Sequence, residues 1–170
     1  MSTNKFINSA KKTIEIQADS IASLINQIDK SFAEIGKKVS LLKGKLIVMG
    51  VGKSGHVGQK VSATLASTGT PSFFIHPTEA AHGDLGMIAK DDAVLIFSNS
   101  GETKEVTEIL PALKRMTSDI FSITGNANSS IAKASSVHLK VQVEKEACPH
   151  DLAPTSSTTC LLYTSDAADE

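Results

Sequence analysis

An apolar run passes into a glycine-rich turn in Lys45-Leu-Ile-Val-Met-Gly-Val-Gly-Lys-Ser-Gly55. A continuous apolar run of this length is typical of a parallel strand that is buried on both faces. The residues that follow, 55–67, have apolar side chains at helical spacing, so they predict a helix. This stretch therefore predicts the strand, turn and helix with which an α/β domain begins.

Four more runs of strand character follow, and helical segments separate them. The predicted strands are 72–76, 93–97, 119–123 and 137–143, and the predicted helices between the later strands are 103–116 and 130–134. Strands and helices that alternate at this spacing favour a parallel sheet with helices on both faces. In such a sheet, ligands bind beyond the carboxyl ends of the strands.

The segment before this pattern predicts one long helix. Apolar residues recur at steps of four and three from Ile14 to Ile35, and Gly36 is a suitable C-cap. Two interpretations remain open. The helix packs on its own domain, or it forms a helix–helix seam between subunits.

Composition excludes several classes of protein. The chain has 170 residues, which suits one domain, and a net charge of -1 with no basic block, so neither nucleic acid nor a membrane is an expected partner. Two cysteines are too few for a disulfide framework. The N-terminus has no apolar segment of signal-peptide length, and we expect a cytoplasmic protein.

The glycine turn matches two nucleotide-binding patterns only in part. Gly-Lys-Ser at 52–54 belongs to the P-loop pattern, but the glycine that this pattern needs is replaced by Ile47. The dinucleotide pattern needs an acidic residue at the end of the second strand, where His76-Pro77 stands, and the nearest acid is Glu79. With both nucleotide patterns incomplete, the sequence predicts only a glycine turn that lets an anion approach the N-terminus of the following helix.

The third strand ends in Ser98-Asn-Ser-Gly-Glu-Thr103. The hydroxyls of Ser98, Ser100 and Thr103, with the N–H groups of the next helix, predict an uncharged phosphate cradle. The plainer alternative is that these hydroxyls only cap the helix.

Further polar residues follow the second and fifth strands. His76 and His82 lie in a loop with glycine and proline, where they could bind a metal ion or act as acid and base. His138 lies within a strand and is expected to be structural. After the fifth strand come Glu144 and Glu146, and then the hydroxyl-rich run 155–159, which is either a loop or a helix cap that closes over a sugar.

These motifs together resemble the arabinose-5-phosphate isomerases, in the order of that family, from about Leu41 to Thr159. The resemblance implies a three-layer αβα sandwich with a five-stranded parallel sheet, the flavodoxin-like SIS domain. It also implies a homotetramer in which neighbouring subunits help to build each site, and interconversion of D-arabinose 5-phosphate and D-ribulose 5-phosphate on the way to the Kdo sugar of lipopolysaccharide. The stretches that carry it are 50–56, 66–74, 76–77, 79–86, 98–102, 146–149 and 152–159.

The resemblance also implies roles for individual residues. Lys53, Glu105 and Glu146 occupy catalytic positions. No cofactor is required, although zinc at His76 would inhibit. The implied substrate contacts are Ser54, Gly69, Thr70, His76, His82, Ser98, Ser100 and Thr103.

The chain departs from the family pattern after Thr159. The family continues with a long helix and a His-Pro-x-Gly motif that carries a catalytic histidine, and many members add paired CBS domains. We therefore expect an N-terminal helix at 1–40, a SIS domain at 41–159 and a non-family tail at 160–170 without a helical core stripe. The alternatives to this isomerase are a SIS isomerase of another sugar phosphate and a non-catalytic sugar-phosphate sensor.

Overall fold

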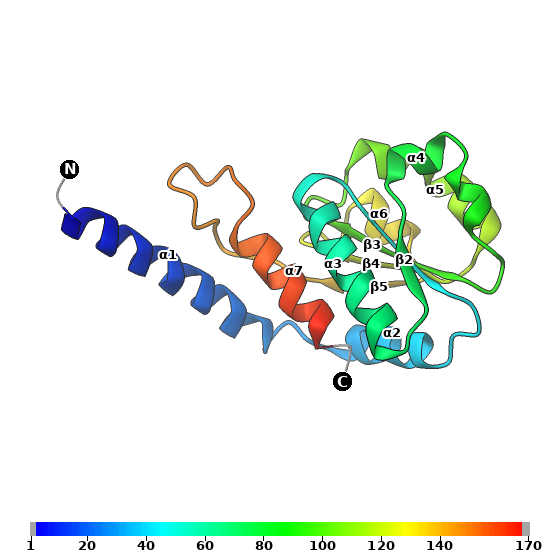
Figure 1. The fold of residues 1–170 in the computed structure, drawn as a ribbon, viewed down its shortest axis with the longest axis horizontal. Coiled ribbons are helices and arrows are strands. Elements are labelled where there is room, and N and C mark those ends of the chain that lie inside the picture. The colour runs from blue at the N-terminus through cyan, green and yellow to red at the C-terminus, as the bar shows by residue number, and fades with distance from the viewer. Residues whose placement is uncertain (1–2, 168–170) are drawn as a thin grey trace.

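The computed structural model describes residues 3–167 and has one parallel sheet at its centre (Figure 1). The strand order is β2-β1-β3-β4-β5, and all neighbouring strands are parallel. The predicted five-stranded sheet is confirmed, except that the last strand ends three residues earlier than expected. The strands are β1 (Leu46–Gly50), β2 (Ser72–Phe74), β3 (Ala93–Ser98), β4 (Ile120–Thr124) and β5 (Val137–Lys140).

Helices cover both faces of the sheet, as a three-layer αβα sandwich requires. One core holds apolar side chains from α2, α3 and α7, and the other holds those from α4, α5 and α6. The sheet strands β1, β3 and β4 are buried along their whole length. The helices are α1 (Thr3–Leu24), α2 (Lys30–Ser40), α3 (Gly52–Thr68), α4 (Pro77–Ala81), α5 (Lys104–Met116), α6 (Ser130–Ala134) and α7 (Ser156–Asp166), with a 3-10 turn, η1, at Asp84–Met87.

The N-terminal segment forms two helices, so the prediction of one long helix was wrong. The break lies before Lys30, where the Asp29 side chain accepts a hydrogen bond of 2.8 Å from the N–H of Ser31 and caps α2. Such a cap competes with continuation of the helix, although the apolar spacing runs on across it. Gly36 therefore lies inside α2 and is not a C-cap.

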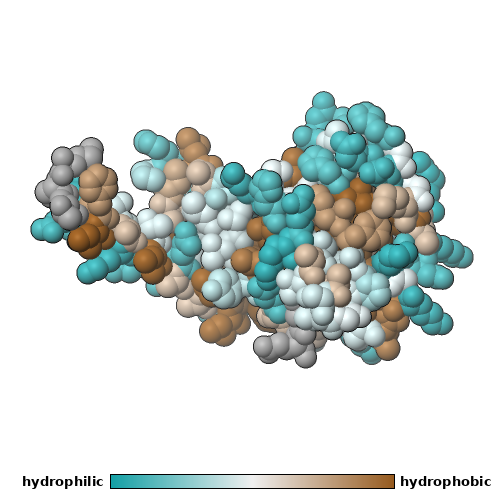
Figure 2. Space-filling model, in the orientation of Figure 1, coloured by the Kyte–Doolittle hydropathy of each residue, from teal (hydrophilic) through white to brown (hydrophobic). Residues whose placement is uncertain are grey.

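Helix α1 extends away from the sheet and contacts α7 along part of its length (Figure 1). Apolar side chains remain on its surface, and they form brown patches along this arm in Figure 2. Phe6 is 64% exposed and Ile14 67%, and Ile25, directly after the helix, is 79% exposed. No helix of the described residues is long and apolar enough to cross a membrane.

The chain after Thr155 forms α7, and the expectation that it lacks a helical core stripe was wrong. Cys160, Leu161, Thr164 and Ser165 are buried at helical spacing. Sequence inspection missed the stripe because half of it is hydroxyl side chains. These can be buried because Thr164 and Ser165 donate to carbonyls four residues back, at 2.7 and 2.8 Å.

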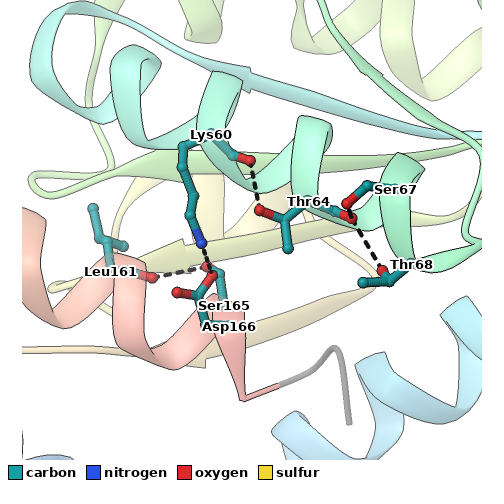
Figure 3. Close-up of polar contacts among 7 residues, drawn as sticks. All are labelled: Lys60, Thr64, Ser67, Thr68, Leu161, Ser165 and Asp166. Carbon is teal, nitrogen blue, oxygen red and sulfur yellow. Dashed lines mark hydrogen bonds and ion pairs between the residues drawn. The ribbon is translucent and has the colours of Figure 1, made fainter.

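Helix α7 lies beside α3, and an ion pair joins their surfaces (Figure 3). The Lys60 ammonium of α3 reaches the Asp166 carboxylate of α7 at 2.5 Å. Both side chains are more than a third exposed, so this pair contributes little beside the buried contacts.

Gly36 offers a test of the packing between α2 and α3. An added Cβ would meet no atom within 4 Å, and the position borders an apolar cavity that Phe32 and Val61 also line. We expect Gly36→Ala to stabilise the protein by about 1 kcal/mol, because alanine has the higher helix propensity. Urea unfolding would measure this.

Gly58→Ala is the matched control. A Cβ at Gly58 would lie 3.1 Å from both the Val48 and the Phe74 side chains, so this change should destabilise the protein. Equal unfolding free energies for the two variants would contradict the packing described for these helices.

Candidate active site at the carboxyl edge of the sheet

The turn between β1 and α3 is tight because its glycines allow backbone to meet backbone. A Cβ at Gly55 would lie 2.8 Å from the carbonyl oxygen of Gly50. Gly52 has a φ of +59°, a conformation that residues with a side chain rarely adopt. The glycine spacing that resembled a nucleotide fingerprint is therefore required by the packing of α3 on β1.

The helix that leaves this turn begins without a side-chain cap. Val51 is the N-cap residue of α3, and it makes no capping hydrogen bond. The first N–H groups of α3 thus have no partner within the helix, and they carry the positive end of its dipole. An anion at this point would meet donors that need no rearrangement.

The Ser98–Thr103 loop lies at the same edge, since β3 pairs with β1 and Gly50 is in register with Phe97. Its hydroxyls have different environments. Ser98 is 2% exposed, accepts from the Gly101 N–H at 3.0 Å and lies 2.8 Å from the Thr103 hydroxyl. Ser98 and Thr103 therefore hold the shape of the loop.

Ser100 is the exposed hydroxyl of this loop, and it accepts from the Glu102 N–H at 3.2 Å. The next helix, α5, has Thr103 as its N-cap, and the Thr103 side chain does not cap it. Two uncapped helix N-termini, those of α3 and α5, thus follow neighbouring strands. The helix N–H groups of the predicted phosphate cradle are thus available, and Ser100 is its exposed hydroxyl.

Two of the expected catalytic residues stand in the first turns of these helices. Lys53 is the second residue of α3, and Glu105 is the second residue of α5. Both side chains are exposed, and neither forms an ion pair with any residue of the range 3–167. Ser54, half-buried, follows Lys53 in the same turn. The charges of Lys53 and Glu105 are therefore free to act on a bound ligand.

Glu146 has a different setting, because its carboxylate holds the start of α7. Its Oε2 atom accepts from the Thr155 N–H at 2.7 Å, the Thr155 hydroxyl at 3.0 Å and the Ser157 N–H at 3.2 Å. Burial alone would raise the pKa of Glu146, but these hydrogen bonds outweigh burial and hold the pKa below its usual range. The sequence signal for this role was Pro154-Thr155, a helix-start pattern.

The histidines differ in what they can offer to a ligand. His76 caps α4 through Nδ1, which accepts from the Thr78 N–H at 3.3 Å and leaves Nε2 for another partner. His82 follows the end of α4 and is exposed. His138 lies in β5 with Nε2 3.0 Å from the Thr124 hydroxyl, and burial lowers the pKa of its imidazole. The expected structural role of His138 fits this position.

Gly69 and Thr70 lie at the far end of α3, away from Lys53. Gly69 is the C-cap, with a φ of +109°, and the Thr70 N–H donates to Leu65 at 2.9 Å. Since α3 has 17 residues, about 25 Å of helix separates them from the glycine turn. Within one chain, Gly69 and Thr70 therefore do not lie at the carboxyl edge, although both were expected to contact the substrate.

The loop that carries Glu146 also lies apart from α4. In Figure 1 this orange segment stands on the side of α1 and α7, and α4 lies beyond α3 on the other side. The described residues contain no group of three or more His, Cys, Asp or Glu side chains that could hold a metal ion. His76 belongs to no such group among these residues, and zinc at His76 stays a prediction.

A groove of about 880 Å³ lies at the opposite, amino edge of the sheet. Its basic residues include Lys37 and Lys38 in the last turn of α2, and Lys114 and Arg115 in the last turn of α5. Cations there offset the negative ends of the two helices. The partial charges of these two helix ends are negative, opposite in sign to those at the N-termini of α3 and α5.

Comparison with known proteins gives a consistent result. The family model described as the SIS domain matches residues 42–168. Arabinose 5-phosphate isomerase KdsD of Pseudomonas aeruginosa is 53% identical over 162 residues, which are 95% of this chain and 50% of that protein. The protein of the same name from Escherichia coli K12 is 52% identical, again over 95% of this chain and over 49% of that protein.

A solved structure has the same fold at high similarity. The protein c3406 of E. coli CFT073, determined in complex with arabinose 5-phosphate, superposes with a TM-score of 0.95 and 41% identity over 99% of this chain and 90% of that chain. The chain spans about half the length of the curated relatives it matches.

The hydrogen bonds of Glu146 predict a pH dependence of stability. Because its pKa is lower in the folded state, the stabilisation is complete above the unfolded pKa and is lost as pH falls through the folded one. Between about pH 6 and pH 3, wild type should lose more unfolding free energy than Glu146→Gln, which keeps an oxygen acceptor but cannot titrate. Parallel stability curves would show that Glu146 does not hold α7.

Proposed function

The chain belongs to the SIS-domain family, and on that basis we propose that this protein interconverts D-arabinose 5-phosphate and D-ribulose 5-phosphate. The observation that carries the proposal is 53% identity over 95% of the chain to a protein named arabinose 5-phosphate isomerase. The carboxyl edge supports it independently. Two uncapped helix N-termini and an exposed hydroxyl suit the phosphate that both sugars carry.

The reaction moves one proton between adjacent carbon atoms and changes no oxidation state overall. A base removes the proton from C2 of the aldose, and the electron pair forms the C1–C2 double bond of a cis-enediol while O1 gains a proton. Return of a proton to C1 and loss of the O2 proton give the ketose. This chemistry needs a base and a donor for the developing oxyanion, and we propose that protein side chains supply both without a cofactor.

The setting of each charged residue suggests its role. Lys53, exposed and unpaired within residues 3–167, is suited to stabilise the oxyanion. Of the two carboxylates, that of Glu105 is exposed and forms no ion pair within residues 3–167, and the Glu146 carboxylate is held by Thr155 and Ser157 with a lowered pKa. We therefore assign proton transfer to Glu105, and we assign to Glu146 the positioning of α7.

A site shared between subunits would account for the residues that one chain keeps apart. Gly69, Thr70 and the loop that carries Glu146 lie away from the glycine turn, and a neighbouring copy could bring its own equivalents there. The exposed apolar side chains of α1 support association of this kind. We propose a homotetramer, as the family resemblance implies, in which zinc at His76 would need ligands from a second chain.

The first test is an isomerisation assay in D₂O. The chain is incubated with arabinose 5-phosphate, and NMR follows the C2 proton and the formation of ribulose 5-phosphate. We expect ketose to form with deuterium at C1, because the enediol takes its proton from solvent. A hybrid chain is assayed in the same way. It consists of this chain up to Thr159, followed by the C-terminal segment of the P. aeruginosa relative.

Each result of this assay has a definite meaning. Exchange at C2 without ketose would indicate a working base and an impaired second transfer. Binding of the sugar phosphate without exchange, in both the chain and the hybrid, would contradict an isomerase and favour a sensor. Faster turnover of another sugar phosphate would reassign the substrate.

Lys53→Ala tests the oxyanion role. We expect kcat to fall by about 10²-fold or more, as for the loss of an oxyanion donor, with a smaller change in KM. Lys90→Ala is the control, because Lys90 is exposed in the groove at the amino edge. An unchanged kcat in Lys53→Ala would remove this residue from the mechanism.

A further inference from the structure

The side chain of Glu102, near the end of the Ser98–Thr103 loop, binds the start of α6. Its Oε1 atom accepts a hydrogen bond of 2.7 Å from the Ser130 N–H. Hydrogen bonds from Ser130, with a smaller effect of the Lys133 charge, hold the pKa of the Glu102 carboxyl below its usual range. The group is exposed, yet it is directed to one backbone donor in another element.

Two further contacts join the same loop to the β4–α6 segment. The Ile131 N–H donates to the Gly101 carbonyl at 3.1 Å, and the Gly125 N–H donates to the Asn99 carbonyl at 2.9 Å. Gly101 has a φ of +69°, and a Cβ there would overlap the Ser129 hydroxyl. The loop is therefore supported along its length by a neighbouring element.

The position of Glu102 also determines where the exposed hydroxyl of the loop points. The backbone N–H of Glu102 donates to the Ser100 Oγ at 3.2 Å, and one residue later the chain reaches the uncapped start of α5. A shift of Glu102 would therefore move Ser100 relative to the first N–H groups of α5. Both groups belong to the proposed phosphate site.

We propose that Glu102 is a positioning residue, whose hydrogen bond to Ser130 holds Ser100 and the N-terminus of α5 in the geometry that binds phosphate. The inference rests on the phosphate-binding role proposed for this loop. It adds a residue that touches no substrate atom and acts through the loop backbone.

The charge of Glu102 and its hydrogen bond to Ser130 predict opposite changes in phosphate affinity when the side chain is removed. A carboxylate two residues from Ser100 has the same sign as a phosphate dianion, so by Coulomb repulsion alone its removal would strengthen phosphate binding. If the hydrogen bond to Ser130 fixes the loop, its removal weakens binding. Glutamine separates the two effects, because it keeps an oxygen acceptor and has no charge.

The test compares wild type, Glu102→Ala, Glu102→Gln and the control Glu108→Ala. Glu108 is exposed on α5 and lies 3.7 Å from Lys104, so its pair contributes little. Inorganic phosphate is titrated into each chain and followed by ³¹P NMR, and kcat and KM are measured with arabinose 5-phosphate. Thermal unfolding verifies that each variant is folded.

For Glu102→Ala we expect the Kd of phosphate and the KM to rise about five- to tenfold, the size of one lost hydrogen bond, with kcat within about twofold of wild type. Glu102→Gln should bind as tightly as wild type or more tightly, and Glu108→Ala should be unchanged.

Unchanged or tighter phosphate binding by folded Glu102→Ala would overturn the inference, and so would a Glu102→Gln variant as weak as the alanine variant. The expected pattern of phosphate affinities, with no turnover of arabinose 5-phosphate by wild type or by the hybrid chain, would support the positioning role and contradict the isomerase. Turnover by wild type with an equal KM in all variants would support the isomerase and contradict the positioning role. Absence of both phosphate binding and turnover in wild type and in the hybrid chain would overturn both.

Discussion

Helix α3 can pack on β1 only because no side chain separates Gly55 from the carbonyl of Gly50. This contact of backbone on backbone brings the start of α3 to the carboxyl edge, and the other features of the site depend on it. A methyl group at Gly55 would push the helix away, and a residue other than glycine at Gly52 would strain the turn. The anion site, the position of Lys53 and the α3–α7 contact would all move with the helix.

The proposed phosphate site is made mainly of backbone. The N-termini of α3 and α5 supply partial positive charge, and the Ser98–Thr103 loop is shaped by its own hydroxyls and by α6. Fixed dipoles hold an anion without the conformational cost of ordering long cationic side chains. In this proposal Lys53 is left free for the oxyanion, so that binding of phosphate and chemistry at the sugar depend on different groups.

Several of the expected site residues lie apart from the glycine turn within one chain. The end of α3 and the loop that carries Glu146 present expected site residues away from the glycine turn, and α1 exposes apolar side chains on an arm that leaves the sheet. The proposed homotetramer would bring these residues together from neighbouring chains.

The sequence alone determined the alternation of strands and helices from β1 to β5, and it predicted the carboxyl edge as the ligand site, because apolar runs, helical spacing and glycine turns are local properties of the chain. It did not reveal the cap at Asp29 that divides the first helix, or the hydroxyl-lined stripe that buries α7. Only the tertiary structure decided that Ser98 faces inward and that Glu146 and Glu102 bind backbone N–H groups of distant elements. Those partners lie 9 to 28 residues away along the chain, and folding, not sequence spacing, brings them within hydrogen-bonding distance.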